Sequence, residues 1–333
     1  MLQRFRYLVL LFLGVAFFAA CNLVDEDLRD CETDYHIDYE LKLVTELTTE
    51  IRSELSVDTD ISVAESLESY FKDIFSDHAN DVDLSFYDVQ EDSIRLHHES
   101  HIMNASQSSY TLYIPVRKYM HLAVANLRDN TFLSLREDEY CATSTISQQV
   151  KDTIPAQRAG LFTARLPMDI LENTDQQFDV RLFMANSAAT LVVDTLDSHI
   201  RDMKVFMTGF ATGFDIRDSV YRFDYTPVIV ANPVAMSKPG YQSFASVSFP
   251  SRDEIETKAS SSLSLWQISI YTTISDGTVT KTVLGINEPL PAGHIKVIEA
   301  KAQENGQVAP GDPTVGVSVT MDWESGLEQE IPL

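Results

Sequence analysis

The chain has 333 residues, of which 44% are hydrophobic and 10% aromatic, and its 50 acidic and 25 basic residues give a formal net charge of −25. A surface this acidic repels nucleic acid and lacks the basic stripe needed to bind it, so the sequence predicts no nucleic-acid partner. The hydrophobic content argues against a disordered chain, and the length fits two domains better than one.

The first twenty residues have the pattern of a secretory signal. Arg4 and Arg6 precede an almost wholly apolar run over residues 7–18, and two small residues then lead to Cys21. The run is shorter than the ~20 apolar residues that a transmembrane helix needs. A cysteine at the cleavage position resembles a bacterial lipoprotein signal, so we predict a signal peptide over residues 1–20 and an acylated Cys21 at the mature N-terminus. An ordinary signal with a chance cysteine and an uncleaved anchor are the alternatives.

Residues 21–32 are predicted to form an acidic tether. Their acidic run over residues 25–27 is similar to the export signal that follows the lipidated cysteine in Bacteroidota surface lipoproteins, whereas a solvated stalk is the simpler interpretation. With Cys21 acylated, Cys31 and Cys141 remain. In an oxidising compartment these two form a candidate disulfide, worth up to ~4–5 kcal/mol in the entropic model. Two free buried thiols are the alternative.

The first predicted domain, residues 33–150, is a β-sandwich with one helix. Apolar residues alternate with polar ones from Tyr35 to Leu43, which predicts a strand with one buried face. From Val63 to Phe75 apolar residues recur at helical spacing. Further strands are predicted at residues 82–86, 94–96, 110–114 and 120–124.

Glycine and proline divide the chain. No glycine occurs between Gly14 and Gly160, and the first proline is Pro115. We place a domain boundary in the polar stretch 142–160, which gives a second domain over residues 151–333. Its alternating runs predict a second antiparallel β-sandwich. The clearest runs are 178–184, 203–207, 266–274, 279–283 after a turn at 275–277, and 315–323.

The chain contains few motifs that carry chemistry. It has no phosphate-binding loop, no nucleophile elbow and no zinc-protease motif, so the sequence predicts no cofactor. On a strand, His97, Glu99 and His101 would point the same way and present two nitrogens and one oxygen to a metal. They are a weak metal candidate, because no fourth ligand is visible, and a polar strand end on a solvated face is the alternative.

Four motifs resemble, in sequence and in order, those of one protein family. They are the acidic-Leu-x-x-Cys opening at 25–31, the strand at 82–88, the two strands within 110–126, and the closing Val-x-Val-x-x-Asp-Trp-x-x-Gly at 317–326. The aromatic residue and the glycine of the family's third motif are missing at Val124-Ala125-Asn126. The chain is thus similar to the FimB/Mfa2 family of fimbrial subunits from Bacteroidales.

The resemblance implies two tandem transthyretin-like antiparallel β-sandwich domains, the first with one helix. It implies a lipid-anchored accessory subunit, not an enzyme, that attaches fimbriae to the outer membrane at the cell surface through Cys21. Its partners would be fimbrial stalk subunits, joined by β-strand addition. Residues 315–323 have the composition of a donor strand, although an ordinary core strand is favoured. Cleavage after Arg29 or Arg52 would free the body from its lipid, so we predict that the N-terminus is retained.

A glycan-binding surface lipoprotein is the alternative function. Such a protein would need exposed aromatic platforms. Both tryptophans, Trp266 and Trp323, instead lie in apolar stripes that predict core positions, although some of the 13 tyrosines are available for this role.

Overall fold

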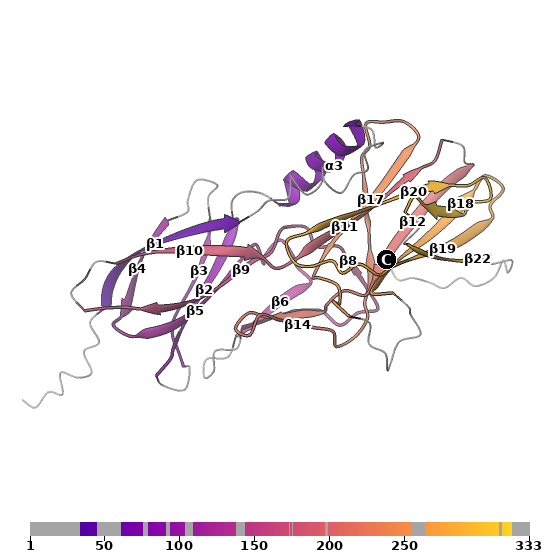
Figure 1. Cartoon of the computed structure of the whole chain (residues 1–333). Helices are drawn as coiled ribbons and strands as arrows, with labels where there is room; N and C mark the ends of the chain where they lie inside the picture. The colour runs from indigo at the N-terminus through magenta and orange to yellow at the C-terminus, as the bar shows by residue number, and fades with distance from the viewer. Residues whose placement is uncertain are drawn as a thin grey trace, which may run out of the picture.

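A computed structural model describes residues 34–44, 61–75, 79–90, 94–103, 109–137, 144–172, 174, 176–196, 199–254, 264–312 and 315–321. In this part of the chain the protein is mainly β, with one helix, and it has an elongated outline (Figure 1). No helix among the described residues is long and apolar enough to cross a membrane. The prediction of a mainly β protein is confirmed, and the described residues contain one helix, as predicted.

The first sandwich is a seven-stranded sheet with the order β3-β2-β5-β9-β10-β1-β4. Strands β9 and β10 pair only at Thr163 with Phe183 and at Phe162 with Met184, so the sheet opens there into two layers. Buried residues from both layers share one hydrophobic core. The strands are β1 (Asp34–Val44), β2 (Asp81–Asp88), β3 (Arg95–Ile102), β4 (Ser109–Pro115), β5 (Lys118–Ala125), β9 (Phe162–Asp169) and β10 (Gln176–Met184).

The second sandwich packs a five-stranded sheet, β16-β17-β11-β20-β21, against a six-stranded sheet, β22-β19-β18-β12-β15-β8. The strands of the five-stranded sheet are β11 (Ser187–Asp194), β16 (Asn232–Val234), β17 (Tyr241–Ser248), β20 (Ile295–Ala302) and β21 (Val308–Pro310). Those of the six-stranded sheet are β8 (Thr153–Pro155), β12 (Ile200–Thr208), β15 (Val228–Val230), β18 (Trp266–Ile274), β19 (Val279–Ile286) and β22 (Gly316–Met321).

A third, smaller sheet lies below the junction of the two sandwiches (Figure 1). It has the order β14-β13-β7-β6, and its strands come from both halves of the chain. They are β6 (Leu133–Glu137), β7 (Ser144–Gln148), β13 (Gly213–Asp215) and β14 (Val220–Arg222).

The helix α3 (Ile61–Ile74) lies over the five-stranded sheet, and its buried residues belong to a core cluster that also includes the core of the first sandwich. Its buried residues, Leu67 and Phe71 among them, share a core cluster with Ala188 and Val192 of β11. Strand β11 is therefore buried on both faces, which explains its almost continuous run of small and apolar residues. Figure 1 shows α3 lying over β11 and β17.

The domain boundary expected between residues 150 and 151 stays a prediction, and strands from both sides of it share sheets. Strands β9 and β10 lie after this point and complete the first sandwich, whereas β7 lies before it and pairs with β13. Three strand pairs are also parallel, namely β1 with β10, β11 with β20, and β15 with β8, so the sheets are not purely antiparallel as expected. Alternation in the sequence shows which face of a strand is buried, but it does not show which strand lies beside it.

Buried amide side chains join the two sandwiches. The Asn130 Oδ1 accepts from the backbone N–H of Arg158 at 2.8 Å, and its Nδ2 donates to the Asn126 carbonyl at 3.2 Å. The Asn186 Nδ2 donates to the Gln157 Oε1 at 2.8 Å and to the Ala159 carbonyl, at 3.1 Å. Because Asn130 and Asn186 are fully buried, these bonds fix the path of the segment 157–159 that lies between the two sandwiches.

We expect Asn130→Ala to lower the free energy of unfolding by roughly 2–4 kcal/mol, because buried backbone groups lose their partner. Urea unfolding followed by fluorescence measures this. The exposed Asn287→Ala is the matched control and should change stability by less than ~0.5 kcal/mol. An unchanged midpoint for Asn130→Ala would contradict a structural role for the network.

A buried histidine makes the first sandwich sensitive to acid. The His121 ring stacks on Phe86, with centroids 4.2 Å apart, and its Nδ1 donates to the Ser85 carbonyl at 3.1 Å. Burial lowers the pKa of His121 from its ordinary value near 6.5 to about 4. As the pH falls, the His121 imidazole is therefore protonated near pH 6.5 in the unfolded chain, but only near pH 4 in the folded protein.

We expect His121 to remove roughly 3 kcal/mol of stability as the pH falls from 6.5 to 4. The His121→Asn variant keeps a donor near Ser85 but does not titrate, so its free energy of unfolding should depend less steeply on pH across this window. The exposed, non-titrating Asn287→Ala variant is again the control and should leave the slope as in the wild type. Equal slopes for His121→Asn and the wild type would refute the assignment.

Candidate functional site: sheet edges and the junction groove

The predicted metal candidate lies on β3, an edge strand of the first sandwich. His97, Glu99 and His101 share one face, as predicted. The Nε2 of His97 lies 2.6 Å from the Glu99 Oε1, and the Nε2 of His101 lies 2.7 Å from its Oε2. The carboxylate thus bridges the two imidazoles along the strand.

This row does not have the geometry of a chelate. The Glu99 carboxylate itself lies between the two imidazoles and occupies the Nε2 atom of each. Among the described residues, no group of three or more His, Cys, Asp or Glu side chains is arranged to hold a metal. The solvated polar strand is the better account of this segment.

The other face of β3 is also occupied by ionisable groups. The Asp83 carboxylate of β2 lies 3.0 Å from the His98 Nε2 and accepts from the Ser100 hydroxyl at 2.5 Å. Charged and polar side chains on both faces of an edge strand hinder another chain from pairing with it. The His-rich segment therefore protects this edge.

Most other sheet edges in the described part of the chain are blunted as well. Strands β8, β16 and β21 have three residues each and contain Pro155, Pro233 and Pro310. Strand β14 is equally short, and β6 carries Arg136 and Glu137. Short length, proline and charge are the usual defences of sheet edges.

Two edge strands lack these defences. Strand β4 has seven residues without a charge, and its only proline is its last residue; the exposed fraction of Tyr113 on this strand is 60%. Strand β22 has six residues, with no charge and no proline. It pairs antiparallel with β19, from Gly316 opposite Gly285 to Met321 opposite Thr280. The described part of the C-terminal run, which was predicted as a donor or a core strand, thus pairs with a strand of its own chain. Trp323 falls outside the described residues.

A groove of about 330 Å³ lies where the first sandwich meets β13 and β14. Its wall includes Phe183, whose exposed fraction is 59%, and the stacked pair of Phe214 and Tyr221, with centroids 4.5 Å apart. The Tyr221 hydroxyl donates to the Ala185 carbonyl, and burial raises its pKa. One exposed ring is not the coplanar platform that a glycan-binding surface needs, so the alternative function stays a prediction.

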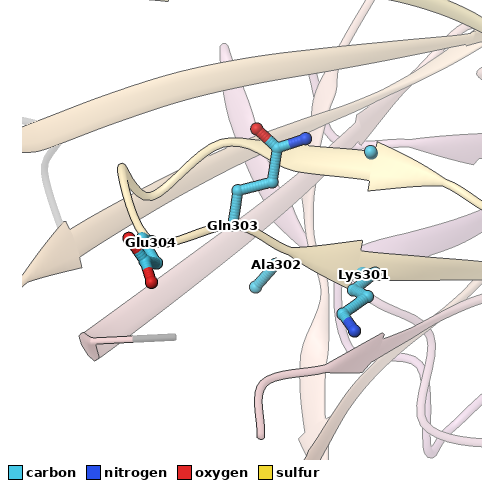
Figure 2. Close-up of a pocket in the computed structure, with 5 residues that line it drawn as sticks. Lys301, Ala302, Gln303 and Glu304 are labelled. Carbon is cyan, nitrogen blue, oxygen red and sulfur yellow. The ribbon is translucent and has the colours of Figure 1, made fainter. Parts of the chain in front are cut away.

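A second hollow, of about 360 Å³, lies beside the β20–β21 hairpin. Figure 2 shows Gln303 extending to the opposite side of the ribbon from Lys301 and Glu304. The remaining lining residues are Ala302 and Ala309. These side chains do not converge on a common point, so the hollow has no arrangement for recognising a ligand.

The predicted lipidation site and the candidate disulfide lie outside the described residues. This applies to Cys21, Cys31 and Cys141, and to the signal peptide and tether predicted over residues 1–32. The lipidation site, the disulfide, the signal peptide and the tether all remain predictions.

The chain matches the family model described as fimbrillin-A associated anchor proteins Mfa1 and Mfa2 over residues 30–325. It therefore belongs to this family of fimbrial anchor proteins. The match confirms the resemblance seen in the sequence and the prediction that the protein is not an enzyme. No curated protein matches the chain in sequence.

Solved structures are similar to this chain at low sequence identity. A candidate adhesin from Bacteroides ovatus is 10% identical, with a TM-score of 0.51 over 87% of this chain and 97% of that one. A candidate polysaccharide-binding protein from Bacteroides thetaiotaomicron is also 10% identical, with a TM-score of 0.50 over 84% and 97%. The fimbrial anchor protein Mfa2 from Porphyromonas gingivalis is 8% identical, with a TM-score of 0.49 over 86% and 98%.

Proposed function

We propose that this protein is a lipid-anchored accessory subunit that attaches fimbriae to the outer membrane at the cell surface. Its membership of a fimbrial anchor family supports the fimbrial role. The signal pattern that ends at Cys21 supports the anchor. Each buried CH₂ of an acyl chain contributes about 0.8 kcal/mol, so several chains on one cysteine would hold the protein stably in the bilayer.

We expect Cys21→Ala to release fimbriae from the cell, because the variant loses the acyl chains that hold it in the membrane. Fimbriae in the cell-bound fraction and in the medium are compared with those of the native strain. Cys141→Ala is the matched control and should leave fimbriae attached. If Cys21→Ala protein is made and released in soluble form while the fimbriae stay on the cell, the anchor proposal fails.

The proposed subunit contact is β-strand addition at an unprotected sheet edge. The observation that supports it is the contrast, among the described strands, between β4 and β22, which have at least six residues and no charge, and the six other edge strands, which are three residues long or contain charged residues. An added strand would satisfy the outward-facing N–H and C=O groups of such an edge. On β22, Val317 lies opposite the buried Leu284, and Ser318 lies opposite the half-buried Val283.

We expect a lysine on one of these two edges to weaken fimbrial binding about tenfold, because strand pairing would then have to desolvate a charge. The variants are Ser318→Lys on β22 and Thr111→Lys on β4, and binding of purified protein to isolated fimbriae measures the effect. Ser134→Lys on the already charged strand β6 is the control and should bind as the wild type. Unchanged binding by both edge variants, with both folded, would exclude these edges as the contact.

A further inference from the structure

We propose that this protein is a tension-bearing rod, in which a pull on the N-terminus is carried in shear by the parallel strand pair β1/β10. The inference rests on the proposed anchor function, because only a tethered N-terminus would load β1. A fimbria that is bound at β22 of the second sandwich, and dragged by flow or by contact with a surface, would exert such a pull through the second sandwich.

Strand β1 is held on both sides over most of its length. It runs parallel to β10 from Ile37, opposite Gln176, to Val44, opposite Phe183. On its other edge it runs antiparallel to β4 from Asp34, opposite Pro115. Any force that enters the chain before Asp34 therefore reaches a strand with a ladder of hydrogen bonds along each edge.

The direction of the load on β1 and β10 follows from their parallel arrangement. A pull on the tether enters β1 at its N-terminal end, Asp34, whereas the resisting pull of the second sandwich enters β10 at its C-terminal end, Met184. In parallel strands these are opposite ends, so the two forces act along the ladder in opposite directions. The evenly spaced bonds of a parallel ladder then share the load, instead of opening one after another from one end.

The force passes directly from the first sandwich into the second. Only Ala185 and Asn186 separate β10 from β11, and Figure 1 shows β10 pointing toward β11. The Ala185 N–H donates to the Leu161 carbonyl at 2.7 Å, and the Gly293 N–H donates to the Asn186 carbonyl, at 2.8 Å. Together with the side-chain bonds of Asn186, these contacts brace the connection against extension.

The second sandwich repeats the same arrangement. Strand β11 runs parallel to β20 from Ala188, opposite Ile295, to Asp194, opposite Lys301. A pull that enters β11 at its N-terminal end and leaves β20 toward β21 and β22 again acts at opposite ends of a parallel pair. Two parallel ladders therefore lie in series along the path from the tether to the C-terminal strand.

Single-molecule force measurements on the mature chain test the proposal with two pulling geometries. One handle replaces Cys21 at the N-terminus, and Cys31→Ser and Cys141→Ser remove the other native thiols, so that no disulfide bypasses β1. The second handle is attached either at Asp276→Cys, in the exposed β18–β19 turn, or at Glu172→Cys, shortly before β10. A handle at position 276 pulls β1 and β10 at opposite ends, so the ladder between them is loaded in shear. A handle at position 172 pulls both strands at their N-terminal ends, so the hydrogen bonds of the ladder open one after another.

We expect the time to the first unfolding event under a constant load to be at least about tenfold longer with the handle at position 276 than at position 172. The two handle variants control for each other, because both keep the whole chain and differ only in the direction of the load. Equal lifetimes, or a shorter one with the handle at 276, would overturn the proposal. This result is independent of the anchor proposal, which the Cys21→Ala fimbriation experiment tests separately.

Discussion

The hydrogen-bonded junction around Asn130 and Asn186 is the constraint on which the arrangement of the molecule depends. It lies where the first sandwich, the second sandwich and the small third sheet meet, and the segment from Gln157 to Ala159 crosses it. A buried backbone that is neither helix nor strand needs partners for its N–H and C=O groups. The amide side chains supply them, and the direction of β10 relative to β11 is fixed as a result.

The two sandwiches differ in how their edge strands are protected from pairing with another chain. In the first, the His-rich strand β3 closes one edge, while β4 leaves the other edge uncharged. In the second, β8, β16 and β21 end their sheets with short strands that contain proline, and β22 is the exception. Among the described strands, edges that are protected at all but two positions suit a protein that must pair with chosen partners without aggregating. Parallel pairs in series suit the same protein if those partners pull on it.

Particular residues show how far the sequence predicts the structure. The alternation from Tyr35 to Leu43 predicted β1, and the helical spacing from Val63 to Phe75 predicted α3. The shared face of His97, Glu99 and His101 also followed from the pattern, whereas their weak candidacy as a metal site stays a prediction. Neither β4 nor β22 stood out as an edge, since a strand's position in a sheet depends on distant partners.

The sequence by itself determined the mainly β class, the family, the helix and many of the strands, although it did not predict β9, β11, β17 or β20. Short-range periodicity and local motifs carry this information. Only the tertiary structure decided that β9 and β10 complete the first sandwich, that α3 covers the second, and that β1 lies parallel to β10. The physical reason is that strand pairing is a long-range choice: alternate apolar residues bury a face against any suitable neighbour, and packing at the junction selects which neighbour it is.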